Sequence, residues 1–380
     1  MRALFICTYG DFAATFEKNN INILQNIGYE VHVASNFADA SKNRNIHVLE
    51  EMQVILHHIN FDRSPFTKQG LKNLKELDKL IAKYHFEEID CHNPVCGVLG
   101  RICGKKNHVP NIIYTAHGFH FFKGAPLKNW LLYFPAEWLC SWLTDILITI
   151  NKEDYVRAKK HLHAKRTEYI PGVGINVEKY TANYTDREEK RKELGLNVDD
   201  FVVISVGELN CNKNHKVIIE AIAKLKNAKI KYIICGQGEL AEYLTSLIKQ
   251  YNLEKQIYLL GYRSDIKDLL SMADLFAFPS LREGLSMSLM EAMASGLPII
   301  CGNIRGNNDL VEEGKGGYLI TENNINRYAD AIRKIMSKSN EKEIMGNYNQ
   351  KKVRKFDKYQ TNKLMKDIYS KVIVQLNKNY

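Results

Sequence analysis

Short runs of β-branched and other apolar residues alternate with helical patterns along most of the 380-residue chain. In the first half, such runs occupy residues 2–7, 30–35, about 46–50, 86–91, 111–116, 145–150 and 167–170. In the second half, they occupy residues 201–206, 230–235, 257–260, 274–278, 298–301 and 317–320. Strands that alternate with helices pair in parallel, so this order predicts two doubly wound α/β halves. Ligands of such sheets bind outside the carboxyl ends of the strands.

A polar stretch from about residue 178 to residue 200 separates the two halves. A chain of this length has room for two or three domains, each with its own core. We therefore predict a first domain over residues 1–178, a second over residues 179–355 and a terminal helix over residues 356–380.

The chain is basic, with a formal net charge of +10. Much of this charge lies between residues 337 and 380, where ten Lys and one Arg face four acidic residues. Excess positive charge favours phosphate-bearing partners, which include nucleic acid, anionic lipid and diphosphate substrates. Composition alone leaves these three classes open.

The longest apolar stretch, residues 130–150, is long enough to suggest a membrane span. It contains Pro135, Glu137 and Asp145, and a β-branched run follows, so we expect a helix and then a buried strand instead. No signal peptide is expected, because the first apolar run stops at residue 7.

The eight cysteines include no C-x2-C pair, so no zinc site is expected. We predict that they are reduced, buried thiols of a cytoplasmic protein.

Two glutamates, Glu283 and Glu291, stand eight positions apart in the second half. The stretch 286–294 is rich in Leu, Met and Ala and predicts a helix, which Gly296 and Pro298 end. Glu283 then lies in the loop before the helix, and Glu291 lies about two turns inside it. A ligand over this helix start meets backbone N–H groups and the positive dipole end, which suit phosphate, and the carboxylates can hold hydroxyls. The alternative is that both glutamates are unrelated surface residues.

The segment PSLREGLSMSLMEAMASGLP, residues 279–298, resembles the signature of the family 4 glycosyltransferases, which have the GT-B fold. HGFHFFKGAPLKNW at 117–130 and NIRGNNDLVEEGKGGYLI at 303–320 extend the resemblance to bacterial members of exopolysaccharide and capsule assembly. The resemblance covers nearly the whole chain. It implies two Rossmann-like domains that face each other across a cleft, with the terminal helix crossing back to the first domain.

The resemblance also implies a reaction. A sugar leaves a nucleotide diphosphate, with UDP favoured, for a lipid-linked saccharide acceptor such as an undecaprenyl-diphosphate lipid, with retention at the anomeric carbon. The sugar is a hexose or an N-acetylhexosamine, and the leaving phosphate assists deprotonation of the acceptor, so no side chain acts as a covalent nucleophile. The chain has no Asp-x-Asp motif, and a cation with a helix dipole can offset the leaving charge, so neither metal nor cofactor is expected.

By the same resemblance, Glu283 holds hydroxyls of the donor sugar and Glu291 holds the ribose hydroxyls. Backbone N–H groups of Gly284, Leu285 and Ser286 hold the diphosphate. The donor site is thus expected at the start of one helix.

A second donor-binding loop is expected directly after the run at 201–206. Gly207, Glu208 and Lys213 resemble the family's G-R-L-x-x-x-K segment, in which Arg and Lys pair with the diphosphate. Glu208 stands where Arg is usual, so Lys213 must carry more of the anion, and Glu208 can bind a sugar hydroxyl or orient Lys213. Without the resemblance, Lys213 would be interpreted as a solvated cation.

Three further loops resemble donor-binding segments but are weak signals, since any α/β protein has glycine at such turns. Gly10 follows the first strand where the chain passes near the diphosphate, or else forms a tight turn. Gly236 allows close backbone approach to a ligand. Tyr262 or Arg263 can stack on the nucleotide base.

A histidine of the first domain is expected to face the donor sugar. His117 directly follows the run 111–116 and is the preferred candidate, with His120 as its rival. A hydrogen-bonded structural histidine is the alternative for both. His92 also follows a strand and faces the cleft by topology, with a cap role for Asn93 as an equal alternative. We assign His117 to the catalytic group with Glu283 and Lys213.

Residues 66–85 have an amphipathic helical pattern, with a basic and an apolar face on opposite sides at about 100° per residue. The basic face consists of Lys68, Lys72, Lys75, Lys79 and Lys83, and the apolar face of Leu71, Leu74, Leu77 and Ile81. The lysines form either a solvated outer face or a contact for anionic lipid head groups. The aromatic-rich stretch 119–134, with Phe121 and Trp130, is a second candidate for contact with lipid or with a lipid-linked acceptor.

Together these signals predict a glycosyltransferase in the cytoplasm, peripheral on the inner face of the membrane, with a nucleotide-sugar donor and no nucleic-acid partner. Two other classes stay open. A sugar-nucleotide epimerase of the same fold would act without an acceptor. A non-catalytic protein would use its basic tail to bind nucleic acid or membrane, which the intact glutamate pair argues against.

Overall fold

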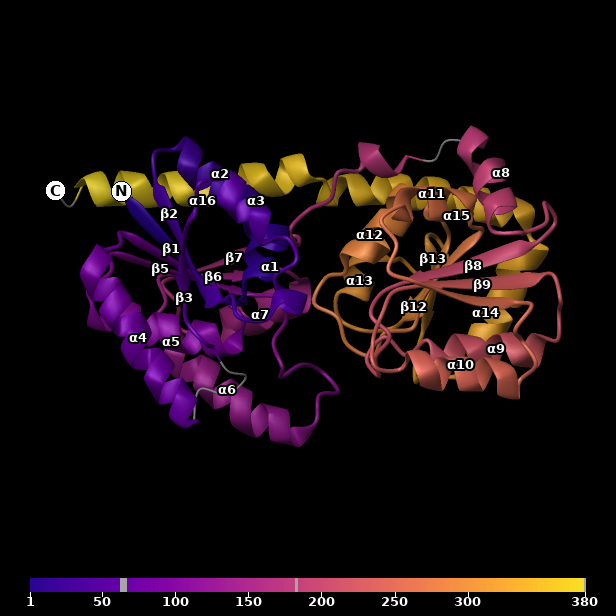
Figure 1. Ribbon diagram of the computed structural model, residues 1–380, viewed down its shortest axis with the longest axis horizontal. Coiled ribbons are helices and arrows are strands. Elements are labelled where there is room, and N and C mark those ends of the chain that lie inside the picture. The colour runs from indigo at the N-terminus through magenta and orange to yellow at the C-terminus, as the bar shows by residue number, and fades with distance from the viewer. Residues whose placement is uncertain (62–66, 182–183, 379–380) are drawn as a thin grey trace. The chain divides into compact units, whose positions relative to one another are not determined.

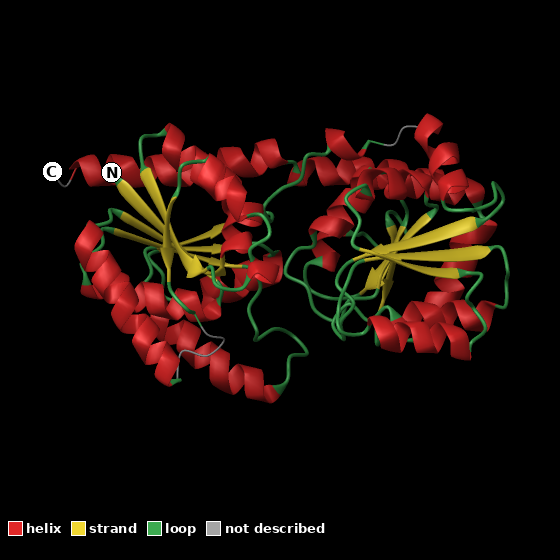
Figure 2. Cartoon of the chain, viewed as in Figure 1, coloured by secondary structure: helices red, strands yellow, loops and turns green. Residues whose placement is uncertain are grey.

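The computed structural model describes residues 1–61, 67–181 and 184–378 (Figure 1). The chain divides into two compact units, Met1–Val173 with Tyr359–Tyr380, and Gly174–Lys358. Each unit is built on one parallel sheet with helices on both of its faces (Figure 2). The prediction of two doubly wound α/β halves is therefore confirmed.

The first unit has a seven-stranded sheet in the order β3-β2-β1-β4-β5-β6-β7. Its strands are β1 (Arg2–Tyr9), β2 (Glu30–Asn36), β3 (Ile55–His58), β4 (Glu88–His92), β5 (Asn111–Ala116), β6 (Ile146–Thr149) and β7 (Arg166–Tyr169). The strand order reverses between β1 and β4, so this pair forms the topological switch point, where α/β sheets bind ligands.

Helices cover both faces of the first sheet (Figure 1). One face is covered by α4 (Lys68–Tyr84), α5 (Pro94–Lys106), α6 (Leu127–Ser141) and α7 (Lys152–His161). The other is covered by α2 (Lys18–Asn26), α3 (Ile46–Glu51) and α16 (Lys358–Lys378). Shorter turns are α1 (Gly10–Phe12), the π-helical η1 (Ala13–Glu17) and the 3-10 helix η2 (Ala40–Lys42).

The last helix packs on the first unit although it follows the second unit in sequence. Met365, Ile368, Tyr369 and Val372 of α16 are buried in the same core cluster as strands β1 and β2. The Tyr369 hydroxyl donates a hydrogen bond to Asp90 Oδ2 at 2.9 Å. This buried contact ties the helix to β4.

One predicted strand is wrong. Residues 46–50 were expected in a strand, but they lie in α3 (Ile46–Glu51), and the third strand is β3 at Ile55–His58. The β-branched residues suggested a strand, whereas helical spacing turns Leu49 fully into the core. β3 pairs only with β2, at the edge of the sheet.

The second unit has a six-stranded parallel sheet in the order β10-β9-β8-β11-β12-β13. Its strands are β8 (Phe201–Val206), β9 (Ile230–Cys235), β10 (Ile257–Gly261), β11 (Leu275–Phe278), β12 (Ile299–Gly302) and β13 (Gly317–Ile320). One face packs against α9 (Lys216–Leu225), α10 (Ala241–Gln250) and α14 (Ile325–Ser337). The other packs against α11 (Ile266–Met272), α12 (Met287–Ala294) and α15 (Ser339–Val353). The remaining elements are η3 (Glu178–Tyr180), α8 (Tyr184–Glu193), α13 (Asn307–Leu310) and η4 (Arg354–Phe356).

The apolar stretch 130–150 forms the helix and buried strand that its polar residues predicted, α6 followed by β6. Across the described part of the chain, no helix is both long enough and apolar enough to cross a membrane.

The prediction of buried thiols holds for seven cysteines, but Cys211 is exposed. It lies in the loop after β8 rather than in a strand.

Candidate functional site

A partly buried ion pair joins two loops at one edge of the second sheet. β8 and β11 are neighbours, so the loops that follow them begin at the same edge. Lys213 Nζ lies 2.7 Å from Glu283 Oε1, with side chains that are 19% and 13% exposed. The Lys213 cation also lies 4.7 Å from the centre of the Phe278 ring. The structure thus brings together two of the three residues assigned to the catalytic group.

The loop that carries Glu283 leads into the predicted helix, which is α12. Ser286 is its N-cap residue, and its hydroxyl accepts a hydrogen bond from the Leu289 N–H at 3.3 Å. Arg305 Nε donates to the Glu283 carbonyl at 3.1 Å. Gly306 has a φ of +81°, and a Cβ there would lie 2.2 Å from the Gly284 carbonyl oxygen. A neighbouring loop therefore fixes the backbone that precedes the helix.

Glu291 is the fifth residue of α12, a little more than one turn inside the helix rather than two. Its Oε1 accepts a hydrogen bond from the Tyr180 hydroxyl at 2.7 Å. Burial raises the pKa of the Glu291 carboxyl, and the hydrogen bond from Tyr180 acts against that rise. No motif or spacing pointed to Tyr180 as this partner, since it lies 111 residues away from Glu291 in the chain.

Glycines allow close packing beside Lys213. Gly236 has a φ of +153°, and a Cβ there would come within 1.8 Å of the Gly207 carbonyl oxygen. A Cβ on Gly207 would lie 3.2 Å from Lys213 Cε. These two glycines therefore let the loops after β8 and β9 pack against each other and against the Lys213 side chain. Their contact with a donor stays a prediction.

The structure separates the remaining candidates of the second unit. Glu208 is exposed, and its Oε2 accepts from Asn210 Nδ2 at 2.9 Å, so its described hydrogen bond does not run to Lys213. Arg263 is held by Asp265, with Nε to Oδ1 at 2.7 Å and Nη2 to Oδ2 at 2.5 Å. Tyr262 is 70% exposed, which leaves its ring accessible for stacking on a base.

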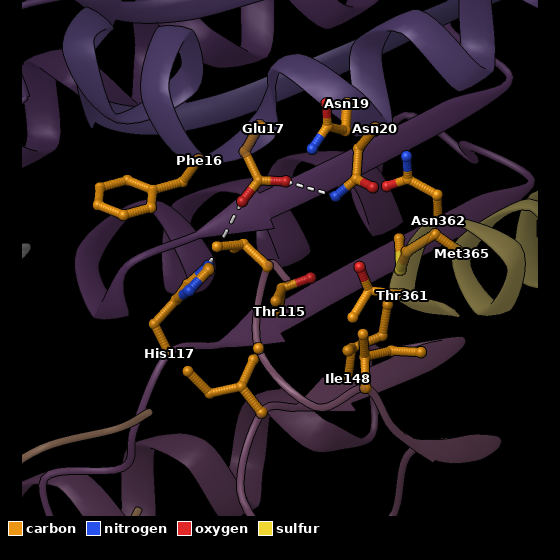
Figure 3. Close-up of a pocket in the computed structure, with 14 residues that line it drawn as sticks. Phe16, Glu17, Asn19, Asn20, Thr115, His117, Ile148, Thr361, Asn362 and Met365 are labelled. Atoms are coloured by element: carbon orange, nitrogen blue, oxygen red, sulfur yellow. Dashed lines mark hydrogen bonds and ion pairs between the residues drawn. The ribbon is translucent and has the colours of Figure 1, made fainter. Parts of the chain in front are cut away.

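In the first unit, His117 lies at the edge of a pocket between η1, β5 and α16 (Figure 3). Glu17 and Phe16 line the same pocket from the π-helical turn. His92 Nδ1 and His117 Nε2 are 3.1 Å apart, and Glu17 Oε1 lies 3.5 Å from the former and 3.7 Å from the latter. The two histidines that were predicted separately thus form one cluster with Glu17.

Burial controls the charge of this cluster. It raises the pKa of Glu17 to about 8, an effect to which the charge of Asp90 adds. It lowers the pKa of His117 to about 4 and that of His92 well below its usual value. At neutral pH the three groups are therefore mainly uncharged, which suits a hydrogen-bonded cluster better than an ion pair.

Among the described residues, one group has ligand atoms close enough together to hold a metal ion, and it consists of Glu17, His92 and His117. Their ligand atoms all lie within 4.8 Å of one another. One carboxylate and two imidazoles are ligands that Zn²⁺ accepts. They come from three separate segments, so no sequence spacing could have revealed them. The absence of a metal stays a prediction.

Two other candidates of the first unit have local partners. The Gly10 N–H donates to Asn43 Oδ1 at 2.8 Å, and a Cβ on Gly10 would lie 2.4 Å from Phe37 Cε1. Gly10 begins the helical turn α1, and its contact with a donor stays a prediction. His120 stacks on Tyr133 with ring centres 4.5 Å apart.

Two family models match the chain: one described as Glycosyl transferase 4-like over residues 6–151, and one described as Glycosyl transferases group 1 over residues 186–352. The chain is 35% identical to EpsD of Bacillus subtilis (strain 168), which is named as a glycosyltransferase. The alignment spans 375 residues and covers 97% of this chain and 96% of EpsD. It is 33% identical over 321 residues to the UDP-Gal:alpha-D-GlcNAc-diphosphoundecaprenol alpha-1,3-galactosyltransferase of Escherichia coli, covering 80% of this chain and 81% of that enzyme.

The chain belongs to the group 1 glycosyltransferases. This glycosyltransferase shares its fold with HepE of Anabaena in complex with UDP and glucose, with a TM-score of 0.79 and 22% identity over 98% of this chain and 100% of HepE. The same fold is found in WaaG, a glycosyltransferase involved in lipopolysaccharide biosynthesis, with a TM-score of 0.75 and 16% identity. This match covers 96% of the present chain and 99% of WaaG. The predicted GT-B fold is thereby confirmed.

The residues that were predicted to meet lipid differ in exposure. All five lysines of the α4 basic face are exposed, although Lys72 lies 3.7 Å from Glu76. Leu71 is 61% exposed and so does not belong to the apolar face of that helix. Phe121 is fully buried and packs against the partly buried Trp130, with ring centres 5.7 Å apart. Phe121 therefore offers no surface to a lipid, because its ring fills the core beneath α6.

Proposed function

We propose that this glycosyltransferase transfers a hexose or N-acetylhexosamine from a UDP-sugar to an undecaprenyl-diphosphate-linked saccharide, with retention at the anomeric carbon, in the synthesis of a bacterial surface polysaccharide. The name of the Escherichia coli relative, which describes a UDP-Gal donor and a diphosphoundecaprenol acceptor, supports this choice. A Campylobacter jejuni relative, 31% identical over 213 residues, is named for transfer to a diphospho-undecaprenol saccharide.

The observation that carries the proposal is the Lys213–Glu283 pair beside the start of α12. A donor diphosphate placed there would meet the Lys213 cation and the backbone N–H groups from Gly284 to Ser286. Both offset the negative charge that grows on the leaving phosphate. Glu283 would then hold hydroxyls of the sugar, and Glu291 would hold the ribose hydroxyls. His117 stays a candidate for contact with the sugar, because its imidazole, neutral at pH 7, has one nitrogen that can donate a hydrogen bond and one that can accept it.

No step of this mechanism requires a divalent metal or a covalent intermediate on the protein. In this proposal, Lys213 and the helix dipole neutralise the charge of the diphosphate in place of a metal. The leaving phosphate oxygen accepts the proton of the acceptor hydroxyl as the new glycosidic bond forms on the same face of the sugar.

A panel of UDP-, GDP- and dTDP-sugars tests the donor class through the melting temperature. A ligand that binds only the folded state raises this temperature, so a UDP-sugar should raise it most. The stabilising sugar is then incubated with a lipid-linked diphosphate saccharide, and the anomeric configuration of the product is read by NMR. An inverted product would contradict the mechanism. Isomerisation of the sugar nucleotide alone would instead indicate an epimerase.

A further inference from the structure

Helix α6 presents a strip of large apolar side chains to solvent. The strip consists of Leu127, Leu131, Leu132, Trp138 and Leu139 of the helix and the C-cap residue Trp142, which are between 38% and 72% exposed. At 100° per residue they fall within one arc of about 140°, which also contains the exposed Pro135 and Lys128. We name this strip the α6 apolar face. Six large apolar side chains in a continuous strip differ from the scattered exposed residues of an ordinary surface.

The opposite side of α6 is anchored in the core. Glu137 is buried, and its two carboxylate oxygens accept hydrogen bonds from Arg101 Nη2 at 2.9 Å and from the Tyr114 hydroxyl at 2.8 Å. Phe134 packs edge-on against the buried Phe121 ring, with centres 5.3 Å apart. These contacts fix the rotation of the helix, so the apolar face cannot turn inward.

The charge around the α6 apolar face is positive. Glu137 is the only acidic residue of the helix, and it points into the core. Lys128 lies within the face, and the neighbouring helix α7 ends with the exposed Lys159 and Lys160. His163, just after α7, stacks on Trp142 with ring centres 4.1 Å apart. An anionic surface complements this arrangement.

We propose that the α6 apolar face docks the first unit on an anionic lipid bilayer, with Trp138 and Trp142 at the head-group boundary. Tryptophan prefers this boundary because its ring is apolar and its N–H is polar. A helix with an apolar face and basic flanks lies in the plane of the interface. This inference rests on the proposed function in one respect, since a polyprenyl-linked acceptor requires the enzyme to work at a bilayer.

A second copy of the chain is a less suitable occupant. Self-association through this face would bring the basic flanks of two copies together, and like charges oppose that contact. The lysines of α4 have a different part in docking. They supply long-range attraction that salt screens, whereas burial of the α6 apolar face persists at high salt.

The tryptophans of the chain provide a direct probe, because all three lie in this region, at Trp130, Trp138 and Trp142. The full chain is mixed with vesicles of phosphatidylglycerol and phosphatidylethanolamine, and with vesicles of phosphatidylcholine alone. Tryptophan emission should shift to the blue on the anionic vesicles, and phospholipids brominated near the head group should quench it. An emission spectrum that anionic vesicles leave unchanged would overturn the proposal.

Charged substitutions on the face test its role. Leu131→Asp/Leu139→Asp should reduce the fraction that co-sediments with anionic vesicles by at least about tenfold at high salt. The matched control, Val198→Asp/Ile344→Asp, changes two similarly exposed apolar residues of the second unit and should bind as the native chain does. Circular dichroism and UDP affinity confirm that both variants fold. Equal sedimentation of the α6 variant and the native chain would refute the docking face.

Two further measurements separate this inference from its rivals. If Lys72→Glu/Lys75→Glu/Lys79→Glu alone abolished binding at high salt, α4 rather than α6 would be the docking element. A blue shift that rises with protein concentration in the absence of lipid, together with a dimer in sedimentation velocity, would assign the face to a second copy. The α6 variant should still act on a short-chain, water-soluble acceptor. Vesicle binding without transfer to any acceptor would contradict the proposed function and leave the docking face supported.

Discussion

Replacement of Lys213 by Met tests the cation on which the proposed donor site depends. Lys213 Nζ lies 2.7 Å from Glu283 Oε1, and both side chains are mostly buried. An ammonium has three N–H donors, so Nζ can keep this carboxylate and still bind a diphosphate oxygen. A charge-assisted hydrogen bond in such a place contributes about 1.5–3 kcal/mol. Lys213→Met should therefore weaken UDP binding by about 10- to 150-fold.

Titration calorimetry with UDP measures this effect in the native chain and three variants. Lys216→Met is the matched control, because Lys216 is 47% exposed and its nearest carboxylate, that of Glu220, is 3.6 Å away. Glu283→Gln should keep UDP affinity within about threefold, since the ammonium retains a polar neighbour, yet it should lose most sugar transfer. An unchanged affinity in Lys213→Met would refute the donor site. A collapse of UDP binding in a folded Glu283→Gln protein would require the roles of the two glutamates to be exchanged.

Three further predictions concern the ribose site, metals and pH. Glu291→Ala should weaken UDP binding by about 1.5–3 kcal/mol in the same titration, because it removes a charged hydrogen bond, and an unchanged affinity would exclude Glu291 from the site. Turnover with excess EDTA should stay within a few-fold of the control, and a loss that magnesium or manganese restores would show a metal in the reaction. Burial raises the pKa of Glu88 from 4.5 to about 8, so the folded state retains a proton that the unfolded state releases, and stability from this group falls as pH rises between these values. Glu88→Gln should therefore have a higher melting temperature than the native chain at about pH 9 and a similar one at about pH 4, and equal temperatures at both pH values would contradict this linkage.

The parts of the candidate site that lie within one short segment could be predicted from the sequence. Ser286 caps α12 and Gly296 ends it, and local propensity sets both features. The position of Lys213 followed from a strand and a glycine-bordered loop. The parallel neighbours β8 and β11 bring Lys213 next to Glu283. The residues themselves did not show that these two strands would be neighbours in the sheet.

Contacts made by distant segments could not be predicted. Tyr180 reaches Glu291 from a short 3-10 helix, and Glu17 reaches the two histidines from a π-helical turn that has no sequence signature. The strand assigned to residues 46–50 failed because a six-residue helix is too short for its period to outweigh its β-branched residues. In each case tertiary packing determined the outcome.

The exposure of α6 illustrates a different limit. In residues 130–150, apolar side chains occur on almost every face of the predicted helix. Hydrophobic periodicity therefore could not show which face of the helix packs against the core. The buried Arg101–Glu137 pair decides this question, because it draws one side of the helix inward and leaves the leucines and two tryptophans outside. A buried ion pair is costly to break, so this orientation is fixed rather than incidental.

The basic tail has a structural explanation that does not require a nucleic acid. Along α16, Met365, Ile368, Tyr369 and Val372 are buried against the first unit, while Lys363, Lys366 and Lys371 are exposed. This is the usual division of an amphipathic helix into a packed side and a solvated side. In α15, Lys342 Nζ lies 3.0 Å from Asp274 Oδ1, so part of the positive charge is already neutralised within the second unit. The buried side of α16 therefore stabilises the first unit, and its exposed lysines form the solvated side of that helix.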